Sequence, residues 1–228
     1  MRNFLVNIKY LPNYKKLRRK LRRLNIISIP GNIDTLVVSY GGVGTSFLMH
    51  YLSEYKLVNN PLDEDFLKHM YCPPKLIPSD IKIIYLYGDP VLAAFSIFRR
   101  NLHYYHSKKL LTINRKRISP IPGSMTLDEY ASNGIDKFYF KDHFKNWICS
   151  EIKNPILFMK YESIFEHRDV IIDFFELPKE ALSDFPLQKE RKSSEAGLNK
   201  ITLKNLNRMY GEFKEEIDSL DDYEIRNF

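Results

Sequence analysis

A strand-like run that leads into glycines and two hydroxyl residues carries the most evident chemistry in this sequence. The stretch "TLVVSYGGVGTSFLMHYL" spans residues 35–52, and its turn consists of Gly41, Gly42, Val43, Gly44, Thr45 and Ser46. Glycines let backbone N–H groups approach an anion, and the positive end of a following helix adds to the attraction. The turn is therefore a candidate phosphate-binding loop, with a simple packing turn as the alternative.

This loop departs from the nucleotide-binding pattern G-x-x-x-x-G-K-[ST] at two positions. Ser39 stands where the first glycine would be, and Thr45 stands where the lysine would be. Because that lysine normally meets the outer phosphates, the sequence disfavours an ordinary nucleoside triphosphatase.

The cysteines and histidines do not form a convincing metal-binding set. Cys72 and Cys149 lack metal-like spacing, and the six histidines fall into no convincing group with them. The two cysteines indicate reduced thiols in an intracellular protein, although a single bridge stays open. His143, close to Trp147 in a helical pattern, has the weaker case for chemistry and is expected to be structural.

Three apolar runs predict buried strands that position the loop: residues 35–40, 81–87 and 155–161. Helical patterns cover about 45–56, 91–106, two stretches between 125 and 151, 163–177 and 198–220, whereas 107–124 predicts a long loop. This alternation predicts an α/β fold of three layers with a mainly parallel central sheet, opened by a P-loop-like strand–loop–helix.

The positive charge of the chain is concentrated in residues 1–30, which hold nine Lys or Arg residues and no acid. The remaining residues balance 26 basic against 28 acidic side chains. Helical spacing of Tyr14, Leu17, Leu21 and Leu24 predicts an amphipathic helix that either packs on the domain or contacts an anionic membrane. Nucleic-acid binding is disfavoured because no aromatic platforms are interleaved with these cations.

The location that we expect is cytoplasmic, with peripheral membrane contact through residues 1–30 as the open alternative. No apolar run approaches the roughly 20 residues that a membrane span needs. The basic start also lacks the apolar core and the cleavage site of a secretory signal.

An ordered set of segments resembles the sulfotransferase family over roughly residues 35–215. The segments are "GGVGTSFL", "LKHMYCPPKLIP", "GDPVLAAFS", "FKDHFKNW", "ILFMKYESIF" and "ERKSS". The resemblance implies a single α/β domain over residues 31–228 that uses 3′-phosphoadenosine 5′-phosphosulfate (PAPS) and no metal. It implies that the glycine loop binds the 5′-phosphosulfate, and that Ser96 with Arg191, Lys192 and Ser193 binds the 3′-phosphate.

The resemblance also implies a catalytic base. Lys68-His69-Met70 falls where family members carry a Lys-Thr-His-Leu-Pro-like segment, whose histidine deprotonates the acceptor hydroxyl. An imidazole suits this task because its pKa lies near the working pH. Lys68 adjoins the base, so both residues are assigned to the catalytic group, while an ordinary loop histidine is the plain alternative.

Two family cations are replaced by glycine in this chain. The lysine of the family loop falls at Gly42, and the arginine that opens the 3′-phosphate motif falls at Gly88. Candidate replacements are Lys68, the Arg191-Lys192 pair, and Arg99 with Arg100. Loss of both contacts without replacement would weaken binding about a hundredfold or more, at about 1.5–3 kcal/mol for each charge-assisted bond.

The function that we predict is transfer of a sulfuryl group from PAPS to an acceptor hydroxyl, on a carbohydrate or a small molecule. The stretch between Asp89 and Asp128 is basic and free of acids, which fits either a solvated loop or a wall for an anionic or carbohydrate acceptor. Two alternatives remain: a catalytically impaired, sulfotransferase-like protein that binds a nucleotide or glycan, and a divergent small-molecule kinase. The sequence leaves the oligomeric state open.

Overall fold

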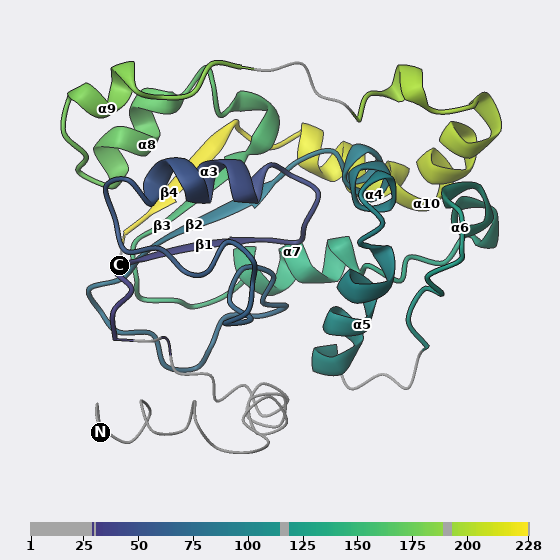
Figure 1. Ribbon diagram of the computed structural model, residues 1–228, viewed down its shortest axis with the longest axis horizontal. Helices are drawn as coiled ribbons and strands as arrows, with labels where there is room; N and C mark the ends of the chain where they lie inside the picture. Colours follow the sequence, from purple (N-terminus) through teal and green to yellow (C-terminus); the bar gives the residue numbers. More distant parts are fainter. Residues whose placement is uncertain (1–28, 30, 115–118, 189–192, 228) are drawn as a thin grey trace.

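The computed structural model describes residues 29, 31–114, 119–188 and 193–227. Its centre is a four-stranded sheet of β1 (Thr35–Ser39), β2 (Lys82–Tyr87), β3 (Ile156–Lys160) and β4 (Tyr223–Arg226), in that order (Figure 1). The first three strands are parallel, and β4 runs antiparallel to β3. The predicted α/β fold with a mainly parallel sheet is confirmed. The amphipathic segment predicted over residues 1–30 lies outside the described residues, apart from Ile29.

Eight helices surround this sheet in the described part of the chain. They are α3 (Thr45–Leu52), α4 (Pro90–Arg99), α5 (His103–Asn114), α6 (Leu127–Asn133), α7 (Phe140–Ile148), α8 (Arg168–Phe174), α9 (Glu180–Ser183) and α10 (Lys200–Asp218). Short 3₁₀ turns occur at Tyr161–Ser163 and Glu195–Gly197. Among the described residues, no helix combines the length and the hydropathy that a membrane span requires.

The alternation of side chains along β2 builds the three layers. Tyr85 points to the α7 face, where its ring lies 5.5 Å from that of Trp147 and 6.1 Å from that of Phe144. Lys82 points to the opposite face and donates from Nζ to the Phe174 carbonyl of α8 at 2.8 Å. Since successive residues of a strand face opposite sides, α7 and α8 cover the two faces of the sheet.

The helix predicted over 91–106 is two helices, and the predicted loop over 107–124 begins as the second half of α5. The break is a Schellman closure: Asn101 adopts φ 55°, its N–H donates to Phe98, and the N–H of Leu102 donates to Ile97. Asparagine tolerates this left-handed conformation better than most residues, so α4 ends and α5 starts in a new direction. The redirection carries α5 toward the glycine loop.

Strand β4 was not predicted, because the sequence pattern ends with the helix that becomes α10. The strand is only four residues long, and its side chains are mostly exposed and include Glu224 and Arg226. Arg226 donates to the Ile148 carbonyl and covers the Phe158 ring, so the strand is held by long-range contacts.

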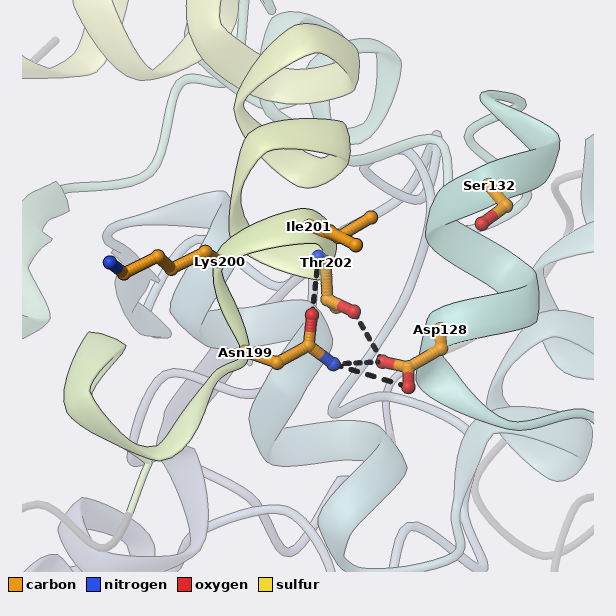
Figure 2. A pocket seen from close by; sticks show the side chains of 6 residues that line it. All are labelled: Asp128, Ser132, Asn199, Lys200, Ile201 and Thr202. Carbon is orange, nitrogen blue, oxygen red and sulfur yellow. Dashed lines mark hydrogen bonds between the residues drawn. The ribbon is translucent and has the colours of Figure 1, made fainter.

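A shallow cavity of about 380 Å³ between α6 and the start of α10 is a structural junction (Figure 2). Asn199 caps α10 by accepting from the Thr202 N–H at 2.8 Å, and it also donates to Asp128 at 3.1 Å. Thr202 Oγ1 donates to the same carboxylate. The polar groups that meet here therefore satisfy one another and join α6 to α10.

Candidate functional site

The segment before Lys68 closes the edge of β1 that β2 leaves open. The Asn59 side chain accepts from the Val37 N–H at 2.8 Å and donates to the Val37 carbonyl at 3.1 Å, as a neighbouring strand would. The Ser39 N–H then donates to the Lys68 carbonyl at 3.0 Å. These bonds fix Lys68 and His69 beside the last residue of β1.

After β1 the chain runs toward one edge of the sheet, and after β2 it runs toward the other edge. Thr35 pairs with Lys82 of β2 on one edge and forms an isolated parallel bridge with Val58 on the other. Helix α3 thus connects β1 to the outer edge, whereas the helices after β2 lead inward to β3. In open α/β sheets, ligands bind beyond the carboxyl ends of strands at such a reversal, which here is occupied by the glycine loop.

The glycine loop uses left-handed backbone at three positions. Gly41, Gly42 and Gly44 have φ of 99°, 78° and 69°, which side chains rarely adopt. Gly44 is the N-cap of α3 and offers no side chain to the first N–H groups of the helix. Those groups have no partner within a helix, so the start of α3 presents donors and a positive dipole end at the loop. Val43 is fully buried in the core.

The hydroxyls of the loop are already tied to neighbouring groups. Thr45 Oγ1 lies 2.6 Å from Ser39 Oγ, which also accepts from the Gly41 N–H at 3.0 Å. Ser46 Oγ accepts from Lys68 Nζ at 2.6 Å. Ser39, which replaces a glycine of the ordinary nucleotide loop, therefore pins the turn from within.

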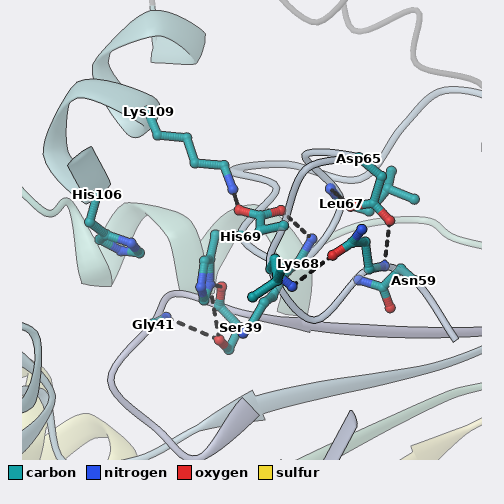
Figure 3. Close-up of polar contacts among 12 residues, drawn as sticks. Ser39, Gly41, Asn59, Asp65, Leu67, Lys68, His69, His106 and Lys109 are labelled. Carbon is teal, nitrogen blue, oxygen red and sulfur yellow. Dashed lines mark hydrogen bonds and ion pairs between the residues drawn. The ribbon is translucent and has the colours of Figure 1, made fainter. Parts of the chain in front are cut away.

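Lys68 and His69 converge on this loop, as the sequence predicted (Figure 3). Lys68 is only 6% exposed, and its Nζ donates to Ser46 Oγ and, at 2.8 Å, to the Pro61 carbonyl. His69 Nδ1 lies 3.0 Å from the Ser39 carbonyl. A carbonyl oxygen only accepts, so Nδ1 carries the proton and Nε2 holds the lone pair that a general base needs.

Burial tunes both side chains toward their neutral forms. Burial and then repulsion from Arg100 lower the pKa of Lys68 to about 8, although Asp65 opposes them. Burial also lowers the pKa of His69 well below its usual range, and His106 and Lys68 lower it further. At neutral pH, His69 is therefore an unprotonated imidazole beside a lysine that still carries its charge.

A pocket of about 940 Å³ opens in front of the loop. Its lining includes loop residues, Lys68 and His69, and the basic side chains Arg100, Lys108 and Lys109. Asp63 is the acid in this lining, and Lys109 forms an ion pair with it. The pocket wall is therefore net positive, which favours anionic ligands. Arg115, Lys116 and Arg117 of the predicted basic stretch lie outside the described residues.

At Gly42 and Gly88, where the sequence predicts that family cations are lost, an added side chain would meet atoms of another segment. A Cβ at Gly42 would lie 2.5 Å from the Ala93 carbonyl oxygen and 2.7 Å from its Cα, because the loop packs on the backbone of α4. A Cβ at Gly88 would lie 2.5 Å from a Glu162 carboxylate oxygen. Lys68 reaches the first turn of α3 from a different segment, whereas a carboxylate occupies the place at Gly88.

The predicted 3′-phosphate residues are only partly brought together. Ser193 is buried, and its Oγ accepts from Arg99 Nε at 3.1 Å, which joins the late segment to α4 one turn beyond Ser96. Arg191 and Lys192 lie outside the described residues. Ser96 and Ser193 do not line the large pocket, so this group is separate from the one at the loop.

The sequence did not predict that Tyr161 and Tyr40 belong to the site. The Tyr161 ring covers Gly44, where it would clash with any Cβ, and Tyr161 directly follows β3. Its position after a parallel strand was a usable signal, since such residues reach the same edge of the sheet. The Tyr40 hydroxyl accepts from the Gly88 N–H at 2.8 Å and donates to the Gly88 carbonyl, which ties the ends of β1 and β2 together. No local pattern predicts that second contact.

One cluster of metal-type ligands occurs among the described residues, away from the loop. Glu166, His167 and Asp222 place ligand atoms within 4.8 Å of one another. His167 Nε2 lies 3.1 Å from Asp222 Oδ2, and this hydrogen bond lowers the pKa of the Asp222 carboxyl. This hydrogen bond joins the start of α8 to the segment that precedes β4.

Comparison with known protein families gives one match, to the sulfotransferase domain, over residues 50–194. The matched range covers more than half of the chain and contains Lys68, His69, Ser96 and Ser193. The glycine loop lies just ahead of it. No curated protein and no solved structure matches the chain.

Proposed function

This chain belongs to the sulfotransferase family, and we propose on that basis that it transfers a sulfuryl group from PAPS to an acceptor hydroxyl. The observation that carries the proposal is the convergence of Lys68 and His69 on the glycine loop at the start of α3. A buried cation, an unprotonated imidazole and a helix N-terminus form one cluster there. Each is a group that sulfuryl transfer requires.

The residues at the loop fit the 5′ end of PAPS. The uncapped start of α3 and the three left-handed glycines supply backbone donors for an anion. Lys68 supplies the charge, and its pKa, lowered by burial, indicates a cation that gains from an anionic ligand. Of the three Nζ protons, two are used by Ser46 and the Pro61 carbonyl, which leaves one directed elsewhere.

His69 acts as the general base. When bound, PAPS supplies a sulfuryl group activated by its link to the 5′-phosphate. His69 accepts the proton of the acceptor hydroxyl at Nε2, while the Ser39 carbonyl keeps Nδ1 protonated and the ring oriented. Lys68 and the start of α3 stabilise the charge that collects on the phosphate side. Ser39, Thr45 and Gly41 hold the loop in shape during this step.

The 3′-phosphate is held by the group on α4. We assign Ser96, Ser193 and Arg99 to it, together with Arg191 and Lys192. The Arg99–Ser193 bond supports this assignment, because it brings a cation and a hydroxyl from distant segments together beyond Ser96. The acceptor lies in the remaining part of the large pocket, where the cations of α4 and α5 favour an anionic or polyhydroxyl molecule.

Calorimetry with adenosine 3′,5′-bisphosphate, followed by a transfer assay with ³⁵S-labelled PAPS, tests this proposal. We expect metal-independent binding and transfer of label to at least one member of a panel of phenols, sugars and hydroxy acids. Binding of ATP that depends on magnesium, without binding of the bisphosphate, would instead indicate a kinase and contradict the proposal.

A second function is favoured by the crowding at Gly42 and Gly88. A lysine at Gly42 would meet the α4 backbone, and an arginine at Gly88 would first meet Glu162. A chain that keeps neither family cation at its own position fits a member that has lost turnover and only binds a nucleotide or glycan. Tight binding of the bisphosphate without transfer to any acceptor would support this role. The two functions also differ in their need for His69, because transfer requires a base and binding alone does not.

A further inference from the structure

We infer that His106, on α5, is a positioning residue that holds the His69 imidazole and the glycine loop in their mutual geometry. For catalysis the inference rests on the proposed function, but the geometry that it describes can be measured in the resting protein. No sequence motif marks His106 for this task; the sequence places it only at the end of a predicted helix, within the basic stretch between Asp89 and Asp128.

The two imidazoles are anchored to adjacent carbonyls at the end of β1. His69 Nδ1 donates to the Ser39 carbonyl at 3.0 Å, and His106 Nε2 donates to the Tyr40 carbonyl at 2.7 Å. Both bonds select one tautomer, since a carbonyl can only accept. The end of β1 thus serves as a common reference for a ring from the 57–70 segment and a ring from α5.

The rings also contact each other and the loop. Their centroids are 4.9 Å apart and their planes cross at 78°, so the edge of one imidazole meets the face of the other. On the other side, a Cβ at Gly41 would lie 2.5 Å from His106 Cε1, so His106 packs directly on the glycine backbone. A rotation of either His69 or the loop therefore requires His106 to move.

His106 is itself held by the core. It is only 8% exposed, and its ring lies 5.7 Å from that of the fully buried Phe138. The Schellman closure at Asn101 sets the direction of α5 and hence the place of His106. The core and the direction of α5 therefore hold His106 in place against His69 and the loop.

The groups around His69 make its contact with His106 measurable through the pKa of His69. Groups that face His69 are His106 from α5, Lys68 from its own segment, His143 from α7 and the Ser39 carbonyl from β1. After burial, His106 is the largest cause that lowers the pKa of His69, and only the Ser39 bond raises it. Removal of the His106 ring opens space beside His69 and removes this neighbour, so the pKa of His69 should rise toward its usual value.

The test compares His106→Ala and His106→Gln with His103→Gln. Glutamine at 106 can donate from its amide to the Tyr40 carbonyl and is the conservative variant. His103 is the matched control: it also lies on α5, is 4% exposed and has Nε2 3.2 Å from the Gly123 carbonyl, but it stacks on Phe98 away from the loop. Nitrogen-15 NMR of the histidine side chains reports the tautomer and pKa of His69 without any need for turnover.

We expect His106→Ala to raise the pKa of His69 and to mix its tautomers. We also expect kcat to fall about ten- to a hundredfold, with the KM for PAPS nearly unchanged, because misplacement of a base costs rate more than binding. His106→Gln should recover the tautomer and most of kcat, and His103→Gln should match the wild type. The inference is overturned if His69 titrates as in the wild type after His106→Ala, or if His103→Gln produces the same changes. A wild-type protein without turnover would refute the proposed function, while the NMR comparison would still decide the role of His106.

Discussion

The glycine loop after β1 and the turn after β2 are neighbours, and the sequence predicts that each has glycine where the family motif has a cation. At the loop, Gly42 packs on the α4 backbone, and the charge comes from Lys68 on another segment. At the turn, Glu162 lies against Gly88, while Asp89 caps α4 and pairs with Lys214. A cation from another segment thus lies at the loop, whereas carboxylates flank the turn.

This difference indicates that, for binding an anion, the position of a cation in space matters more than its position in the sequence. Lys68 reaches Ser46 because the edge of β1 holds the Lys68 carbonyl in place. No comparable contact brings a cation to Gly88 among the described residues, and Lys214 there is occupied by Asp89 and, at 3.6 Å, by Glu195. A ligand that spans both ends should therefore depend mainly on the loop.

The largest effect is expected from His69→Ala, which removes the base but leaves the charges of the loop. Loss of general base catalysis typically costs about 10²- to 10⁴-fold in kcat. Affinity for adenosine 3′,5′-bisphosphate should stay within a factor of about two, since no transfer step is involved. His50→Ala, an exposed histidine on α3, is the control for kinetic assays. Equal loss of rate in both variants would remove His69 from its role.

Lys68→Met should show the next largest effect and tests the comparison directly. Methionine keeps the apolar stem of the buried side chain but removes the charge. Loss of one charge-assisted contact, worth about 1.5–3 kcal/mol, predicts binding of the bisphosphate that is about ten- to 150-fold weaker. Lys214→Met, at the other end, should change this affinity by less than about threefold. Calorimetry on both variants measures the contrast, and the opposite ranking would reverse our interpretation of the two ends.

Restoration of the missing cations should fail at the loop and be tolerated at the turn. Gly42→Lys must adopt φ 78° against the backbone of Ala93, and we expect it to destabilise the protein by about 1–3 kcal/mol. The Cβ of Gly88→Arg first meets the flexible end of Glu162, which can shift. Its cost should be smaller by at least about 1 kcal/mol.

Thermal or urea unfolding measures both glycine variants. If Gly42→Lys proved as stable as the wild type and bound the bisphosphate more tightly, the loop would have room that its packing on α4 denies. Tighter binding by Gly88→Arg alone would show that the turn is a weakened but usable phosphate site.

The smallest effect that we expect is a decrease in the affinity for the bisphosphate as Lys68 loses its proton at high pH. The pKa of Lys68 is lowered to about 8 in the protein without ligand, and a bound anion raises it. Affinity for the bisphosphate is therefore full below about pH 8 and decreases as the pH rises, by at most about tenfold per unit for one proton. Calorimetry at pH 7 to 9.5 measures the slope. Lys68→Met should have lost this part of the dependence, and an unchanged slope in that variant would assign it to another group.

The parts of the molecule that the sequence could predict depend on local pattern. The three parallel strands follow from short buried runs, and the loop follows from its glycines between a strand and a helix. Lys68 and His69 were assigned from their order relative to these elements, and the structure places them at the loop. The family match confirms the assignment to sulfotransferases, and the catalytic roles stay predictions.

The remaining features depend on contacts between residues far apart in the chain. Glu162 fills the space at Gly88 across 74 positions, and nothing near either residue predicts the meeting. Asn59 lies in a polar stretch whose pattern resembles a loop, yet it completes the edge of β1. The break at Asn101 is a local signal, but only its direction in space brings His106 to the loop.

The closure of β1 by the 57–68 segment has a consequence for the cooperativity of the molecule. An unpaired strand edge invites pairing with other chains, and here the stretch that covers this edge carries Lys68 and leads directly into His69. Local unfolding of this stretch would separate both side chains from the glycine loop and expose the edge of β1 in a single event. The geometry of the candidate site and the protection of the strand edge therefore depend on the same contacts.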